Sequence, residues 1–202
     1  MQGTGRLVVA ITGASGAIYA SRFLQHATRH FERIYVMASE QALQVARTEL
    51  GCNLSAGALI ISELLGRSAD NVVVVDRKDY FSPPASGSFR HDGMVVVPCS
   101  MGTAARIANG VSDDLVTRAA DVCLKERRKL ILVVRETPLN LVHLRNMTLL
   151  TEAGAIVMPA SPGFYNNPKS IEELADFIVA RILQQLGVDQ EVSPQWQYTE
   201  TD

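Results

Sequence analysis

The chain contains six short apolar runs that are rich in valine and isoleucine and nearly continuous, with little polar alternation. They span Leu7–Ile11, Ile34–Ala38, Val72–Val75, Met94–Val97, Leu130–Val134 and Ala155–Met158. Strands covered on both faces of a parallel sheet have this character. Segments with a helical period lie between most of them, at about 16–28, 40–48, 57–66, 101–126, 140–153 and 170–186. The alternation predicts an α/β three-layer sandwich, with a parallel sheet and right-handed crossovers.

Length and composition narrow the class of protein. With 202 residues and 47% hydrophobic content, we expect one domain over 1–202, with a core at about 6–187 and a tail at 188–202. The net charge of −2 indicates neither a nucleic-acid surface nor a membrane patch. The chain has three cysteines, Cys52, Cys99 and Cys123. Their odd number and wide spacing favour free thiols in a reducing compartment. Because Leu7–Ile11 is too short for a signal or a membrane span, we expect a soluble cytoplasmic protein.

Two turns of small residues follow predicted strands and open predicted helices. Thr12–Ala17 contains Gly13, Ser15 and Gly16, and its glycines permit a tight turn beside helix N–H groups that favour an anion. Pro98–Thr103 repeats the arrangement after the fourth run. In open parallel sheets, ligands bind beyond the carboxyl ends of the strands, so both turns are expected at one ligand. The alternative for each turn is a serine that only caps its helix.

Arg135 and Glu136 follow the fifth run, where the sheet is expected to open. Arg135 is suited to neutralise a phosphate and Glu136 to move protons. The alternative is a solvent-exposed pair that caps the helix starting near Leu139. Ser39, after the second run, has the character of a plain helix N-cap.

Other candidate residues are weaker. Arg118 and Lys125 share one face of a predicted helix, whereas Arg127, Arg128 and Lys129 are interpreted as a solvated helix end. Tyr165 in a loop and Arg181 in the last helix are compatible with ligand binding or with a surface role. The long segment 76–93, with its double proline, is expected to be a functional loop. The four histidines do not form a pattern typical of a metal site.

Together, these segments resemble the flavin prenyltransferase family known as UbiX, over about residues 6–187. The motifs that carry the resemblance are Thr12–Gly16, Pro83–Ser88, Pro98–Ser100 with Gly102-Thr103, Arg118–Asp121, Leu124–Arg128, Arg135-Glu136 with Pro138, and Pro162–Tyr165 with Pro168. The resemblance implies a flavodoxin-like Rossmann fold in a homo-oligomer, a dodecamer, with each site completed at a subunit interface. It also implies transfer of a dimethylallyl group from dimethylallyl phosphate to N5 and C6 of reduced FMN, without a metal. Prenylated FMN would then pass to a UbiD-type decarboxylase, as in ubiquinone biosynthesis.

The resemblance also assigns roles to residues. Those implied to bind FMN are Gly13, Ala14, Ser15, Ser39, Ser100, Met101, Gly102, Thr103 and Arg135. Those implied in substrate binding are Arg118, Lys125, Tyr165 and Arg181, with Tyr80 and Ser88 in the double-proline loop. Those implied in catalysis are Ser15, Glu49, Lys125 and Glu136, the last as a buried base. Two departures bear on substrate preference: Tyr80 or Phe81 replaces a usual tryptophan, and Met101 stands where the family often has a small or polar residue.

Three other functions are compatible with parts of the pattern. Thr12–Gly16 resembles the opening of a short-chain dehydrogenase, and Tyr165 and Lys169 have the spacing of that family's catalytic pair, although Pro168 lies between them. Flavin-dependent decarboxylases of cysteinyl substrates share the fold, and Leu139-Asn140 with His143 weakly resembles their motifs. An inactive flavin carrier is the third alternative.

Overall fold

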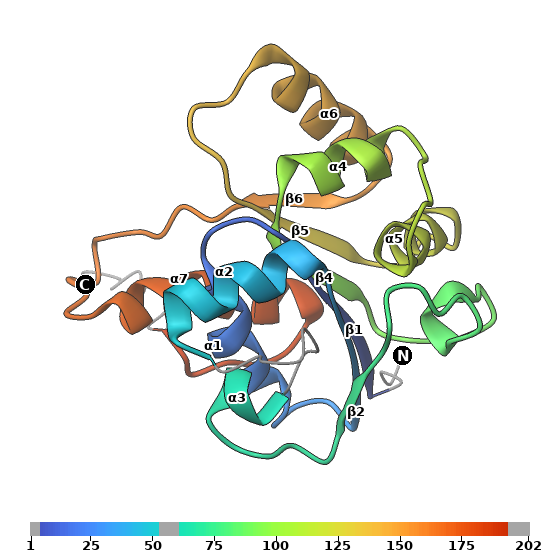
Figure 1. The fold of residues 1–202 in the computed structure, drawn as a ribbon. Helices are drawn as coiled ribbons and strands as arrows, with labels where there is room; N and C mark the ends of the chain where they lie inside the picture. Colours follow the sequence, from blue (N-terminus) through green and yellow to red (C-terminus); the bar gives the residue numbers. More distant parts are fainter. Residues whose placement is uncertain (1–4, 53–60, 194–202) are drawn as a thin grey trace, which may run out of the picture.

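A computed structural model describes residues 5–52 and 61–193. Six parallel strands form one sheet in the order β3-β2-β1-β4-β5-β6 (Figure 1). The strands are β1 (Arg6–Ile11), β2 (Arg33–Ala38), β3 (Val72–Val74), β4 (Met94–Cys99), β5 (Leu130–Val134) and β6 (Ile156–Pro159). All six were expected from the apolar runs. The strand order reverses between β1 and β4, which makes their carboxyl ends the topological switch point.

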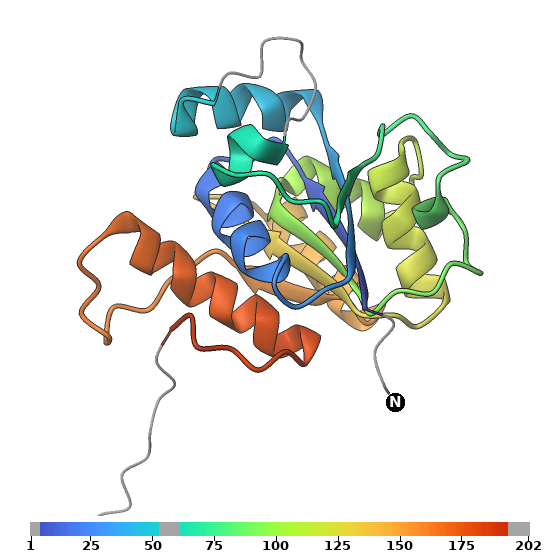
Figure 2. The same ribbon diagram turned by 90° about the horizontal axis from the view of Figure 1, so that it is seen from below.

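Helices cover both faces of the sheet (Figures 1 and 2). On one face lie α1 (Ala17–Ala27), α2 (Glu40–Leu50), α3 (Ile61–Leu65) and α7 (Ile171–Leu186). On the other face lie α4 (Met101–Ala108), α5 (Leu115–Lys125) and α6 (Leu141–Glu152). A short 3₁₀ turn, η1 (Pro83–Ala85), interrupts the long loop before β4 and contacts α5. The three-layer architecture expected from the sequence is therefore confirmed.

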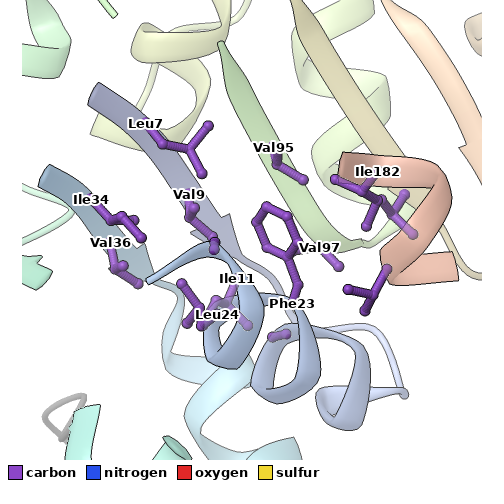
Figure 3. Packing of buried hydrophobic residues seen from close by; sticks show 14 of the residues in the cluster. Leu7, Val9, Ile11, Phe23, Leu24, Ile34, Val36, Val95, Val97 and Ile182 are labelled. Atoms are coloured by element: carbon purple, nitrogen blue, oxygen red, sulfur yellow. The ribbon is translucent and has the colours of Figure 1, made fainter. Parts of the chain in front are cut away.

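Alternate residues of each central strand enter different halves of the core. Leu7 and Val9 of β1 pack toward α1 and α7, whereas Val8 between them packs toward α4 and α5. From Leu7 to Ile11 both faces of β1 are buried, which explains why this run is continuously apolar. Figure 3 shows Phe23 of α1 lying against the sheet near the end of α7 that carries Ile182.

One predicted helix, at 101–126, is wrong: the structure has two helices there. The first ends at Ala108 with Asn109 as its C-cap, and Gly110 follows with a φ of 68°, a conformation that glycine adopts without strain. Asp114 then begins α5, because its side chain accepts a hydrogen bond from Thr117 N and the Thr117 side chain bonds the Asp114 backbone in return. A glycine after the first helix and a capping box before the second thus divide one amphipathic segment into two helices.

Two sequence expectations lie outside the described residues. The first turn of the helix predicted over 57–66 is one of them, and the described part of that segment contains α3. The tail residues Pro194 and Trp196 are the other.

Phe23→Ala is expected to lower the free energy of unfolding by about 3–5 kcal/mol, because the fully buried ring would leave a cavity between α1 and the sheet. Urea denaturation of both proteins measures the difference. Phe81→Ala is the matched control: Phe81 is 103% exposed, so its loss should change the free energy by less than about 0.5 kcal/mol. Equal effects of the two substitutions would contradict this account of the core.

Candidate functional site

Thr12 joins the two small-residue turns at the switch point. Its Oγ1 donates to the Pro98 carbonyl at 2.8 Å and accepts from the Ser100 N–H at 2.8 Å, while its own N–H donates to Pro98 O at 3.2 Å. These bonds hold the end of β1 against the end of β4. The expectation that the two turns converge is therefore confirmed, and the residue that joins them is one to which the sequence assigned no role of its own.

The turn after β2 lies beside this pair. Ser39 N donates to Ile11 O at 2.9 Å, and Ser39 Oγ accepts from Ala42 N at 3.1 Å, which is the plain N-cap expected for α2. A Cβ atom at Gly13 would lie 2.4 Å from Gln41 Cβ, so glycine is required for the β1 turn to approach α2 this closely. The carboxyl ends of β2, β1 and β4 thus contribute to one site.

The amino terminus of α1 binds a carboxylate of the same chain. Its N-cap is Gly16, with a φ of 105° and no capping side chain, so Ser15 is not the cap. Instead the N–H groups of Gly16 and Ala17 donate to Glu49 Oε2 at 2.9 and 2.8 Å. Glu49 occupies the position where the sequence led us to expect a ligand anion, because the last turn of α2 lies beside the start of α1 and the helix dipole favours a carboxylate there.

The environment of Glu49 keeps it ionised. Desolvation raises the pKa of its carboxyl, but hydrogen bonds from Ser15 and from the Ala17 and Gly16 backbone, together with the nearby Arg135 charge, outweigh that effect and leave the pKa below its usual value. The sequence-predicted catalytic residues Ser15 and Glu49 are therefore in contact. As a carboxylate, Glu49 is able to accept a proton or hold a cation at neutral pH.

Arg135 extends from the end of β5 to the turn after β1. Its Nε donates to Ser15 O at 3.2 Å, and its backbone N–H bonds Cys99 O at 3.3 Å. Burial raises the pKa of the Tyr19 phenol, and the charge of Arg135 opposes that rise, which places Tyr19 near the guanidinium. Three predicted site residues, Ser15, Glu49 and Arg135, thus form one cluster.

Glu136 differs from the expectation of a buried base. It is exposed, and among the described residues its Oε1 accepts the N–H of Thr137 in its own loop, at 3.1 Å. The reason is its place one residue beyond Arg135, past the edge of the sheet. The alternative role as a helix cap is also wrong, since Asn140 caps α6.

The start of α4 combines buried and open positions. Ser100 is the N-cap, and its Oγ accepts from Thr103 N at 3.3 Å. Met101 and Thr103 are buried, and the Met101 side chain packs in the core. A Cβ atom at Gly102 would meet nothing within 4 Å, which leaves open space in front of the helix. Ala14, in the first turn, is buried as well.

The residues expected to bind the prenyl phosphate belong to segments on opposite sides of the sheet, since α5 covers one face and α7 the other (Figure 2). Tyr165 packs edge-on against Phe177 of α7 with ring centroids 5.8 Å apart, and Arg181 lies one turn further along the same helix. Arg118 and Lys125 belong to α5 on the other face, where they pair with Asp121 and Glu126. A single chain does not bring these two groups together.

Arg128 holds the double-proline loop on the α5 side. Its guanidinium donates to the carbonyls of Gly87 and Phe89, so the interpretation of Arg128 as part of a solvated helix end is wrong. Within the loop, Ser88 Oγ lies 2.8 Å from Ser86 Oγ. Tyr80, in the same loop, is partly exposed and donates to Ser112 O at 3.3 Å. The backbone of the loop at Ala85 and Gly87 thus lies beside Arg118 and Lys125.

The geometry does not support a metal site or the dehydrogenase alternative. Within residues 5–52 and 61–193, no three His, Cys, Asp or Glu side chains are placed to hold a metal ion. Tyr165 and Lys169 precede α7, so they do not share the helical face that the dehydrogenase alternative requires. None of the helices in the described part of the chain has the length and apolar character needed to cross a bilayer.

Comparison with known proteins agrees with this geometry. The flavoprotein family model matches residues 1–183. A flavin prenyltransferase UbiX from Pseudomonas aeruginosa is 43% identical, over 97% of this chain and 96% of its own. The crystal structure of AnUbiX (PadA1) in complex with FMN and dimethylallyl pyrophosphate is similar with a TM-score of 0.85 and 42% identity, covering 96% of this chain and 98% of that one.

A dodecameric FMN-dependent UbiX-like decarboxylase from Escherichia coli O157:H7 is similar as well, with a TM-score of 0.85 and 38% identity over 96% of this chain and 100% of that one. By contrast, the peptidyl-cysteine decarboxylase EpiD, which represents the cysteinyl alternative, is only 20% identical with a TM-score of 0.57 over 90% of this chain and 97% of its own, a likeness of fold alone. On these matches over nearly its full length, the chain belongs to the UbiX family of flavin prenyltransferases within the flavoproteins.

Proposed function

We propose that this protein joins a dimethylallyl group from dimethylallyl phosphate to N5 and C6 of reduced FMN, giving prenylated FMN. The observation that carries the proposal is the contact between Ser15, Glu49 and Arg135 beside the turns that Thr12 joins. A relative solved with FMN and dimethylallyl pyrophosphate supports the choice of both reactants.

The residues at the switch point fit FMN. Gly13 permits close backbone approach, Gly102 leaves open space before α4, and Ser39 and Ser100 supply hydroxyls at adjacent strand ends. Arg135 supplies a guanidinium, which suits a flavin carbonyl or a phosphate. We therefore assign FMN binding to the segments 13–15 and 100–103, with Ser39 and Arg135.

Reduced FMN supplies the nucleophilic N5 and the ring carbon C6, and the protein supplies charge and proton transfer. Arg135 and the ionised Glu49 place a positive and a negative group beside the turn at Ser15, where they are suited to orient the acceptor. As the bond from C1 of the prenyl group to N5 forms, the C–O bond to phosphate breaks, and cations must neutralise the departing phosphate. We assign that role to Lys125 and Arg181, with Arg118 and Tyr165 as further ligands.

Ring closure then adds a proton to C2 of the prenyl double bond and joins C3 to flavin C6, and a base must take the proton that leaves C6. Glu136 is our candidate, because it follows Arg135 directly at the edge of the sheet and its side chain is exposed. Ser15, hydrogen-bonded to Glu49, is placed to assist proton movement at N5.

The phosphate ligands support a homo-oligomer. Since α5 and α7 are separated by the sheet, Lys125 and Arg181 can serve one phosphate only if different subunits supply them. An apolar surface on α6 is available for such contacts: Leu141 is 60% and Val142 62% exposed, and Leu144 and Leu149 are also exposed. The dodecameric relative supports a closed assembly of this kind, and we propose a dodecamer.

Three further expectations stay predictions. Delivery of prenylated FMN to a UbiD-type decarboxylase and a cytoplasmic location rest on the family resemblance. The division into a core at 6–187 and a tail at 188–202 rests on the sequence pattern.

Anaerobic incubation of the protein with reduced FMN and dimethylallyl phosphate is expected to yield a flavin heavier by one C5 unit, because the proposed site would bind a nucleophilic flavin next to a phosphate leaving group. Mass spectrometry of the released flavin measures the gain. Dimethylallyl diphosphate is tested in parallel to determine which donor is preferred. Tight FMN binding without any mass gain would identify an inactive flavin carrier and refute the proposal.

Glu136→Gln is expected to reduce formation of the ring-closed product by about 10²-fold or more, since an amide cannot accept the C6 proton. The rate is followed by the flavin absorption spectrum and by mass. Glu152→Gln, at the exposed end of α6, is the matched control and should keep the wild-type rate. Undiminished ring closure by Glu136→Gln would remove Glu136 from the mechanism.

Val142→Glu is expected to reduce the native mass of the protein, because a charge would enter the apolar α6 surface at a subunit contact. Light scattering after size-exclusion chromatography measures the mass. Val74→Glu is the matched control, since Val74 is 46% exposed on β3, at the opposite edge of the sheet from β6. If Val142→Glu retains the wild-type mass, α6 is not part of the assembly.

A further inference from the structure

A chain of hydrogen bonds links Arg106 to the turn after β4. Arg106 Nη2 donates to Thr103 Oγ1 at 3.3 Å, and Thr103 Oγ1 lies 3.0 Å from Ser100 Oγ. Thr103 is only 3% exposed, whereas Ser100 is partly exposed at the site. Thr103 is therefore enclosed behind Ser100, and its hydroxyl connects Arg106 to a side chain that a ligand can reach.

The donor and acceptor capacities of these groups indicate which hydroxyl donates in each hydrogen bond. A guanidinium has no acceptor, so the Arg106 contact uses a lone pair of Thr103 Oγ1. The second partner of that oxygen is Ser100 Oγ, and an oxygen that already accepts from a guanidinium is polarised to donate its own proton, which favours donation from the Thr103 hydroxyl to Ser100 Oγ. Ser100 Oγ also accepts from Thr103 N, which fills both of its lone pairs. The remaining function of the Ser100 hydroxyl is to donate outward.

Acidic side chains hold Arg106 in this orientation. Its Nη1 pairs with Asp113 at 2.8 Å and lies 3.6 Å from the buried Asp114. Asp114 caps α5 and is also 3.9 Å from Arg77, which pairs with Glu40 of α2 at 2.7 Å. Because Arg106 is anchored by groups from the α4–α5 connection, its contact with Thr103 does not depend on a ligand.

We propose that Arg106 is a positioning residue that acts through Thr103 to make the Ser100 hydroxyl a donor to the phosphate of FMN. This inference rests on the proposed function for the identity of the ligand. An anionic oxygen is the acceptor that gains most from a donor at the amino terminus of α4, where backbone N–H groups favour negative charge. Arg106 thus acts without touching the flavin.

The test compares binding of FMN with binding of riboflavin, which lacks the phosphate. Thr103→Val removes the linking hydroxyl at nearly constant volume, and Arg106→Met removes the guanidinium at similar length. Each is expected to weaken FMN binding about tenfold, as for the loss of one hydrogen bond to a charged group, and to leave riboflavin binding unchanged. Thr103→Ser keeps the hydroxyl and should restore FMN affinity. Dissociation constants come from flavin fluorescence titration.

An equivalent contact remote from the site provides the control. Arg67 Nη2 donates to Thr28 Oγ1 at 2.7 Å, near the carboxyl end of α1. Thr28→Val and Arg67→Met make the same chemical changes there and should leave the affinities for FMN and riboflavin at their wild-type values. Thermal unfolding of every variant checks that it is folded, and Thr103→Val alone decides the test if Arg106→Met does not fold.

The outcomes separate the inference from the proposed function. If FMN and riboflavin lose affinity equally, or if neither does, the phosphate-directed role of Arg106 is wrong. Failure of the wild-type protein to bind FMN at all would instead refute the proposed function, before any variant is compared.

Discussion

The hydrogen bonds of Thr12 determine where this molecule can bind a ligand. A parallel sheet places all its strand ends along one edge, but only where the strand order reverses do the connections diverge to opposite faces and leave an opening. Here that point lies between β1 and β4, and Thr12 bonds both Pro98 and Ser100 across it. Each such bond contributes about 1 kcal/mol, so the gain in stability is small. Their main effect is to hold two glycine-containing turns at a fixed separation.

The site beside these turns has two parts with different electrostatics. Glu49 and Arg135 form a charged part at the start of α1, where the carboxylate satisfies the helix dipole. The hydroxyls of Ser39 and Ser100 form a neutral, donor-rich part at the starts of α2 and α4. Because the protein's own carboxylate occupies the first helix terminus, an anionic group of the flavin is better accommodated by the second part. The division matches a ligand that has a redox-active ring at one end and a phosphate at the other.

The sheet that builds this site also prevents one chain from completing it. Lys125 on α5 and Arg181 on α7 are separated by a layer of strands that is buried on both faces. The apolar residues exposed on α6 have no partner layer within the described chain, although the opposite side of α6 is buried at Leu150. Both observations have one physical explanation, which is association of identical subunits. A leaving-group site shared between subunits would couple assembly to activity.

The sequence alone determined the strands, most of the helices and the residue types at the strand ends, since apolar runs such as Leu130–Val134 have one stable environment. The sequence also contained the glycine that separates α4 from α5, Gly110. The helical periodicity of the apolar residues on both sides led us to predict one continuous helix there. What tertiary structure decided was which polar groups meet: Glu49 reaches Gly16 across two helices, Arg106 reaches the Ser100 turn through Thr103, and Arg128 binds the double-proline loop. The contacts of Glu49 and Arg128 join residues that are far apart in the sequence and follow no helical or strand periodicity. They depend on how the helices pack against the sheet, which no local pattern specifies.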